Sequence, residues 1–161
     1  MNTKLKALKL ILDEIDVPSK ITAVEDRKKV QKAIYLGQEA GVDLGFHFGW
    51  YKMGPYSPEL TKDYYDLAEE LALNDNDFSC SELASAVKER LVVVKSIIKP
   101  PEGVNLPQED WMELLASLCY LQKNNNSFEE AKTILHAEKR NLFDYVDIAE
   151  SILKKNSMVN S

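Results

Sequence analysis

One stretch constrains the backbone more than any other part of the chain: residues 49–60, Gly-Trp-Tyr-Lys-Met-Gly-Pro-Tyr-Ser-Pro-Glu-Leu. Its two glycines reach backbone angles that other residues avoid, and its two prolines fix φ and lack an N–H donor. Ser57 is typical of a helix N-cap, and Pro58 and Glu59 suit the first helical turn, where the helix dipole favours an acid. The stretch therefore predicts a forced turn that ends a strand and begins a helix.

Residues 44–53, just before this turn, alternate between apolar and small or polar side chains, which is the two-residue period of a β-strand. The apolar face consists of Leu44, Phe46, Phe48 and Trp50. We expect one strand or one short hairpin here. Because a lone hairpin is only marginally stable in water, its aromatic face should pack against helices.

The remaining segments show the spacing of three and four residues that is typical of amphipathic helices, with start and stop signals between them. We expect helices over residues 3–15, 23–40, 58–71, 79–98, 108–123, 128–141 and 145–153. Capping boxes at Thr22/Glu25, Ser79/Glu82 and Ser127/Glu130 mark three of the starts. The predicted fold is mainly α, a single globular multi-helix domain of about seven helices, with one small β-hairpin or strand around residues 44–53.

The predicted domain covers residues 1–155, with a possible subdivision at residues 100–107, where three prolines and a glycine oppose regular structure, and a flexible polar tail at 156–161. A chain of 161 residues with 45% hydrophobic residues can bury one sizeable core. The net charge of −6 argues against a protein that coats nucleic acid nonspecifically. No run of about 18 apolar residues occurs, so we expect no membrane span and a cytoplasmic location.

Residues typical of catalysis or metal binding are few. Neither Cys80 nor Cys119 has zinc-site spacing, and His47 and His136 have no catalytic partners nearby in sequence. The acidic residues in the polar run 74–77 lack the order of a calcium-binding loop. No phosphate-binding loop, dinucleotide fingerprint or nucleophile elbow is present. We therefore expect no catalytic residue, no cofactor and no metal, although a site assembled only in space stays open.

Two groups of side chains are candidates for binding. The aromatic residues around the Gly-Pro turn form either core or a partner surface, namely Trp50, Tyr51, Tyr56 and Tyr64. The second group, Arg27, Lys28 and Lys32, lies on neighbouring helical turns. It forms either a basic patch that binds phosphates or an acidic partner, or a helix face that only makes the protein more soluble.

Two parts of the chain together resemble a known family. Residues 28–36, Lys-Lys-Val-Gln-Lys-Ala-Ile-Tyr-Leu, followed by residues 50–58, Trp-Tyr-Lys-Met-Gly-Pro-Tyr-Ser-Pro, resemble the small prokaryotic family typified by YwgA and, more distantly, the Panacea antitoxin domain. The resemblance implies a mainly helical domain with a small hairpin. Panacea domains neutralise partner toxins by binding them in two-gene bacterial or phage-borne systems, whereas the YwgA-like family has no established activity.

Three classes of function remain. The first is a noncatalytic protein-interaction module, antitoxin-like or accessory to a mobile-element or phage-related system, with an unidentified protein partner. The alternative is a winged-helix-like DNA-binding regulator, which the helix, helix, hairpin order and the eight basic against five acidic residues in positions 1–32 favour. The third is a hydrolase or nuclease with a metal held by the acidic helix faces. The sequence leaves the oligomeric state open.

Overall fold

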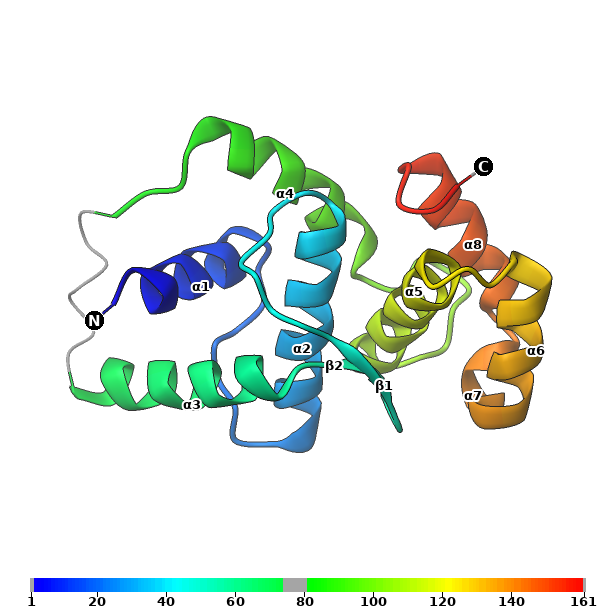
Figure 1. Cartoon of the computed structure of the whole chain (residues 1–161), viewed down its shortest axis with the longest axis horizontal. Coiled ribbons are helices and arrows are strands. Elements are labelled where there is room, and N and C mark those ends of the chain that lie inside the picture. The colour runs from blue at the N-terminus through cyan, green and yellow to red at the C-terminus, as the bar shows by residue number, and fades with distance from the viewer. Residues whose placement is uncertain (1, 74–80, 161) are drawn as a thin grey trace.

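The computed structural model describes residues 2–73 and 81–160 and is mainly helical, with one small antiparallel sheet (Figure 1). In chain order the elements are α1 Thr3–Glu14, α2 Val24–Glu39, β1 Gly49–Tyr51, β2 Gly54–Tyr56, α3 Pro58–Leu73, α4 Ser85–Ile97, α5 Gln108–Lys123, α6 Phe128–Glu138, α7 Arg140–Phe143 and α8 Val146–Lys155. The predicted fold class of about seven helices with one small β element is confirmed. The described residues form eight helices because the backbone of Lys139, at φ −139° and ψ 58°, separates α6 from α7.

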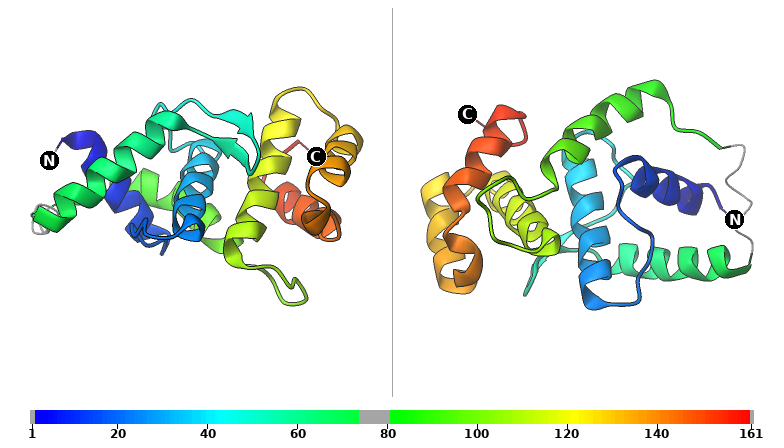
Figure 2. Two further views of the ribbon diagram at one scale, coloured as in Figure 1. Left: turned by 90° about the horizontal axis from the view of Figure 1, so that it is seen from below. Right: turned by 180° about the vertical axis from the view of Figure 1, so that it is seen from behind.

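Helix α2 runs through the middle of the molecule, with α1, α3 and α4 on one side and α5 to α8 on the other (Figures 1 and 2). It packs most extensively against α5. Helix α5 is buried nearly all round, from Trp111 to Cys119, as expected for a helix in the centre of a core. The loop at residues 100–107 joins α4 to α5, and helices on both sides of it contribute to one hydrophobic cluster.

The Gly-Pro pair lies inside a strand, which corrects the prediction of a turn there. Strand β2 contains Gly54 and Pro55 and pairs with β1 in the register Gly49 with Tyr56 and Tyr51 with Gly54, so the turn of the hairpin lies at residues 52–53. Proline is tolerated because this two-stranded sheet consists only of edge strands. The hairpin, residues 49–56, therefore overlaps the second half of the predicted range of 44–53 and extends three residues beyond it.

Residues 44–48 are not a strand, although their side chains alternate in burial as predicted: Phe46 is buried and His47 is exposed. The backbone groups of Phe46 bond to a side chain instead of a neighbouring strand. Gln38 Nε2 donates to the Phe46 carbonyl at 3.1 Å, and the Phe46 N–H donates to Gln38 Oε1 at 3.0 Å. Gly45, at φ +81°, bends the segment, so no ladder forms.

Two of the predicted helix caps are confirmed, at Ser57 and at Ser127. The Leu60 N–H donates to Ser57 Oγ at 3.2 Å, which caps α3, and Ser127 and Glu130 cap α6 reciprocally. At α2 the prediction is wrong by one residue, because the N-cap is Ala23, whose N–H donates to the Asp26 carboxylate at 3.0 Å.

The predicted start at Ser79, the polar run 74–77 and Cys80 lie outside the described residues. Helix α4 itself begins at Ser85, after the predicted position. Beyond α8, Met158 and Val159 pack against the core. No helix in the described part of the chain is both long enough and apolar enough to cross a membrane.

Candidate functional site

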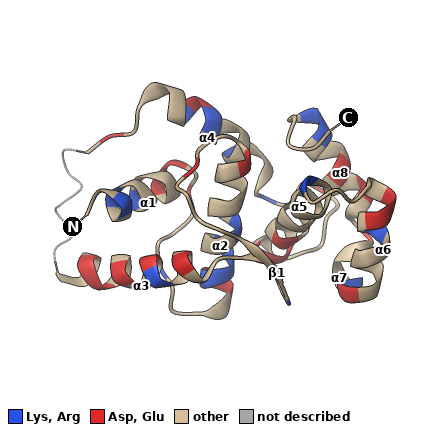
Figure 3. Ribbon diagram, in the orientation of Figure 1, with Lys and Arg blue, Asp and Glu red and all other residues tan. Residues whose placement is uncertain are grey.

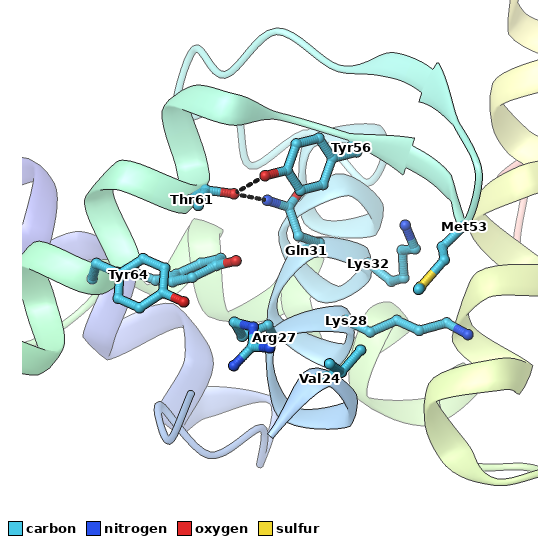
Figure 4. Close-up of a pocket in the computed structure, with 10 residues that line it drawn as sticks. Val24, Arg27, Lys28, Gln31, Lys32, Met53, Tyr56, Thr61 and Tyr64 are labelled. Atoms are coloured by element: carbon cyan, nitrogen blue, oxygen red, sulfur yellow. Dashed lines mark hydrogen bonds between the residues drawn. The ribbon is translucent and has the colours of Figure 1, made fainter. Parts of the chain in front are cut away.

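A pocket of about 270 Å³ opens between α2, the hairpin and α3 (Figure 4), and we call it the α2–α3 pocket. The residues that line it are Val24, Arg27, Lys28, Gln31, Lys32, Met53, Tyr56, Thr61, Tyr64 and Tyr65. Helical geometry explains why these residues of α2 and α3 line the pocket. Positions 24, 27, 28, 31 and 32 share one face of α2, and positions 61, 64 and 65 share one face of α3.

Gln31 holds the polar wall of the pocket together. It is 2% exposed, and its amide makes a reciprocal pair with the Ser57 backbone: Nε2 donates to the carbonyl and Oε1 accepts from the N–H, each at 2.9 Å. Gln31 Nε2 also donates to Thr61 Oγ1 at 3.0 Å, and Thr61 Oγ1 donates to the Tyr56 hydroxyl at 2.6 Å (Figure 4). One side chain of α2 therefore fixes the junction between β2 and α3.

Next to the pocket, Glu113 on α5 forms ion pairs with two lysines that are far apart in sequence. Its Oε1 lies 2.5 Å from Lys28 Nζ and its Oε2 lies 2.6 Å from Lys139 Nζ. Lys28 also pairs with Asp110 at 2.7 Å. The side chains of Glu113 and Lys139 are only 8% and 4% exposed, so their ion pair is buried. Removal of one partner would leave the other charge buried without a counter-charge.

Two lysines also bind the hairpin through its carbonyl oxygens. Lys32, which is 1% exposed, donates from Nζ to the Pro55 carbonyl at 2.6 Å, and Lys139 donates to the Lys52 carbonyl at 2.6 Å. We call Lys28, Lys32, Lys139, Asp110 and Glu113 the lysine cluster. It connects α2, α5, the hairpin and the start of α7.

The pKa values of Lys32 and Lys28 shift in opposite directions within the lysine cluster. Burial lowers the pKa of Lys32 to about 7; Glu113 opposes this shift, and the positive charges of Lys28 and Lys139 contribute to it. Burial alone would also lower the pKa of Lys28, but its bonds to Asp110 and Glu113 outweigh burial and raise that pKa. Near neutral pH, Lys32 is therefore the lysine of this pair that gains or loses a proton.

The predicted basic patch of Arg27, Lys28 and Lys32 does not form a solvent-facing stripe. Lys32 is buried, and Lys28 is held by two carboxylates of α5. Arg27 donates to the carbonyls of Ile21 and Thr22 at 2.9 and 3.1 Å. The three side chains all line the α2–α3 pocket. The carboxylates that hold Lys28 inward lie on α5, which is remote in sequence, so the sequence of α2 alone does not show this orientation.

The four predicted aromatic residues divide between two places. Tyr56 and Tyr64 line the α2–α3 pocket, and Tyr51, half exposed, lies edge-to-face against Tyr56 with ring centroids 5.1 Å apart. Trp50 projects elsewhere, since neighbouring strand residues face opposite sides. It stacks on Tyr120 of α5 at 5.7 Å and donates to the Glu138 carboxylate at 3.4 Å. The four residues therefore do not form one surface.

The rim of the pocket is apolar and exposed. Val24 is 50% exposed, Met53 43% and Tyr65 49%. These residues come from α2, from the hairpin turn and from α3, and all three line the pocket. An exposed apolar rim around a polar and cationic interior is the arrangement expected for a recognition site.

Sequence reasoning missed Gln31, Thr61, Glu113 and Lys139. Two of them carry a signal: Gln31 lies beside Val30 in the buried part of α2, and Glu113 is a single acid in the apolar run of residues 111–118. A polar residue in such a run is kept only where it has a partner, so both mark buried polar contacts. Thr61 and Lys139 carry no comparable signal.

Within residues 2–73 and 81–160, no three His, Cys, Asp or Glu residues lie close enough to hold a metal ion. Comparisons of the chain with protein-family models, with curated proteins and with solved structures give no match. The resemblance to the YwgA-like family stays a prediction.

Proposed function

We propose that this protein is a noncatalytic protein-interaction module and that it holds its partner at the α2–α3 pocket. The observation that carries the proposal is an exposed apolar rim above a cationic interior. Of the seven large apolar side chains that are most exposed in the described part of the chain, Val24, Met53 and Tyr65 surround this one pocket. A partner that covers them removes apolar surface from water, which favours association.

The partner that fits is a protein segment with apolar side chains and a net negative charge. Arg27, Lys28 and Lys32 line the pocket, and no carboxylate does so among the described residues. Acidic residues run along α3 (Figure 3), but the α3 residues that line the pocket are a threonine and two tyrosines. Charge complementarity of this kind selects acidic segments over basic ones.

The size of the pocket suits one or two side chains of such a segment. Its volume of about 270 Å³ lies just below the range of about 300–1,000 Å³ that is typical of small-molecule sites. Tyr51 extends the apolar rim along the hairpin through its contact with Tyr56. Tyrosines are enriched among the residues that dominate interface energetics, so the rest of the segment would lie across Tyr51 and Tyr65.

Selection of short random peptides displayed on phage, with the purified protein as bait, tests this proposal. Enriched peptides should be apolar and acidic. Synthetic copies should bind in fluorescence polarisation, and Tyr65→Ser and Met53→Ser should each weaken binding at least about fivefold, because truncated interface anchors cost more than about 1 kcal/mol. The matched control is Val92→Ser on α4, a residue that is also exposed but does not line this pocket, and it should bind like wild type.

Two outcomes would overturn the proposal. One is the absence of any shared feature among the selected peptides, and the other is equal binding of those peptides to wild type and to the rim variants. A DNA duplex measured in parallel examines the winged-helix alternative. If the protein bound DNA with an affinity that fell steeply with salt, and bound no peptide, a DNA-binding regulator would replace the interaction module.

A further inference from the structure

We propose that the group that the α2–α3 pocket receives from its partner is a carboxylate, the side chain of an Asp or Glu, and that Lys32 is the residue that selects it. The inference rests on the proposed function, because it names the chemistry recognised at the same pocket. It starts from the position of Lys32, which lines the pocket with a side chain that is 1% exposed.

The charged groups around Lys32 are already paired with one another. From α2, Lys28 pairs with Asp110 and with Glu113, and after α6 Lys139 pairs with Glu113 as well. The hairpin offers Lys32 only the neutral carbonyl of Pro55, at 2.6 Å. In the part of the chain that the structure describes, no carboxylate lies within ion-pair distance of Lys32.

The other described residues of the pocket walls supply no negative charge. From α3, Thr61 and Tyr64 are neutral, as is Tyr56 from β2, and Arg27 on α2 adds a further positive charge near the opening. Three lysines therefore share two carboxylates, which leaves one positive charge unbalanced when Lys32 is protonated.

A buried ammonium without a counter-ion is relieved in one of two ways: it loses its proton, or it gains an anion. The free protein follows the first route, since burial lowers the pKa of Lys32 to about 7. A bound carboxylate opens the second route and raises the pKa of Lys32 in the complex. Binding above neutral pH therefore takes up a proton, and affinity should fall as the pH rises through and beyond 7.

The unbalanced charge also distinguishes a carboxylate from a phosphate. One negative charge neutralises the lysine cluster, whereas the second charge of a phosphate group, at about −1.5 to −2 near neutral pH, would need Arg27, whose guanidinium already donates to the carbonyls of Ile21 and Thr22. A carboxylate next to an apolar side chain also matches the apolar rim formed by Val24, Met53 and Tyr65.

The test uses 3-phenylpropanoate as the probe, with neutral 3-phenylpropanamide as its matched control and phenyl phosphate as a third arm. Backbone amide shifts in NMR titrations report the binding site and the affinity from about pH 6 to about pH 9. The carboxylate should shift residues of α2, the hairpin and α3, and its affinity should fall by up to about tenfold per pH unit above the pKa of Lys32. The amide should bind more weakly and without dependence on pH.

Calorimetry in two buffers of different ionisation enthalpy should show proton uptake for the carboxylate alone. Lys32→Met keeps the aliphatic stem but removes the charge, so it should bind acid and amide equally at every pH. The control is Lys29→Met, at a neighbouring lysine that does not line the pocket, and it should retain the acid preference. Should Lys32→Met fail to fold, the wild-type comparison of acid with amide decides alone.

Equal binding of acid and amide by the wild type, an affinity independent of pH, or no binding of 3-phenylpropanoate would overturn the inference. Tighter binding of phenyl phosphate would replace the carboxylate with a phosphate. Phage-selected peptides that depend on Tyr65 but bind equally across this pH range would refute this inference and leave the proposed function standing. Peptides that bind the rim variants as tightly as the wild type would refute the proposed function itself.

Discussion

Replacement of Glu113 by glutamine should destabilise the fold by about 3–5 kcal/mol, the usual cost of removing one partner from a buried ion pair. The two oxygens of Glu113 each hold a different lysine, Lys28 at 2.5 Å and Lys139 at 2.6 Å. Glutamine has the same shape but only one acceptor oxygen, so its NH₂ group would face an ammonium. The variant would also leave the lysine cluster with a larger unbalanced positive charge, so we expect the upper part of the range.

Urea unfolding followed by circular dichroism measures this loss as a lower midpoint with an unchanged slope. Glu69→Gln, at an exposed position of α3, is the matched control and should stay within about 0.5 kcal/mol of wild type. Because Lys139 depends on Glu113, the two changes should not be additive. In a Lys139→Met background, Glu113→Gln should cost less than in wild type, with a coupling of about 0.5–3 kcal/mol.

A loss below about 1 kcal/mol, the range of exposed pairs, would show that Glu113 does not act as a buried partner. Strict additivity of Glu113→Gln and Lys139→Met would likewise refute the arrangement in which one carboxylate serves both lysines. A changed slope in the urea transition would mean either that the substitution alters the compactness of an end state or that unfolding is no longer two-state.

Three further predictions concern single positions. The free energy of unfolding of the free protein should rise between pH 7 and about pH 10, because the unfolded chain keeps the Lys32 proton up to about pH 10.4 while the folded protein loses it at about pH 7. Urea unfolding should show that this free energy rises by at most about 1.4 kcal/mol per pH unit. The same pH dependence in Lys32→Met would contradict this reasoning. Gly54→Ala should lower stability by about 1–3 kcal/mol more than Gly103→Ala, because both glycines have positive φ but only a Cβ at Gly54 would lie 2.7 Å from Ser117 Oγ; equal thermal shifts would argue against this contact. Ser57→Ala should cost about 1 kcal/mol in the same assay through loss of the α3 cap, and Ser57→Asn should recover part of it; no recovery would point to the buried site at Ser57 instead of capping.

The local signals predicted most of the helices. The cap at Ser57, the box of Ser127 with Glu130, and the apolar run of α5 each depend on residues within a few positions of one another. The same locality explains why the alternation of burial at Phe46 and His47 was predicted correctly. Helical spacing likewise placed Arg27, Lys28 and Lys32 close together.

Only the tertiary structure decided what those residues do. Gly54 and Pro55 belong to a strand because a partner strand pairs with them, and residues 44–48 do not because the side chain of Gln38 takes the bonds at Phe46. Nor does the spacing of Trp50 and Tyr56 show that they lie in different environments.

The sequence by itself determined most of the helices, the caps of α3 and α6, and the shared face of α2 that carries the basic residues. The tertiary structure decided that these lysines face inward, since the carboxylate Asp110 lies 82 positions from Lys28 in the chain and Glu113 follows one turn later. Helix propensity and capping act over one or two turns, whereas an ion pair requires two distant helices to be packed side by side. The basic face read along α2 is therefore the cationic interior of a pocket, and the packing of α5 against α2 is the reason.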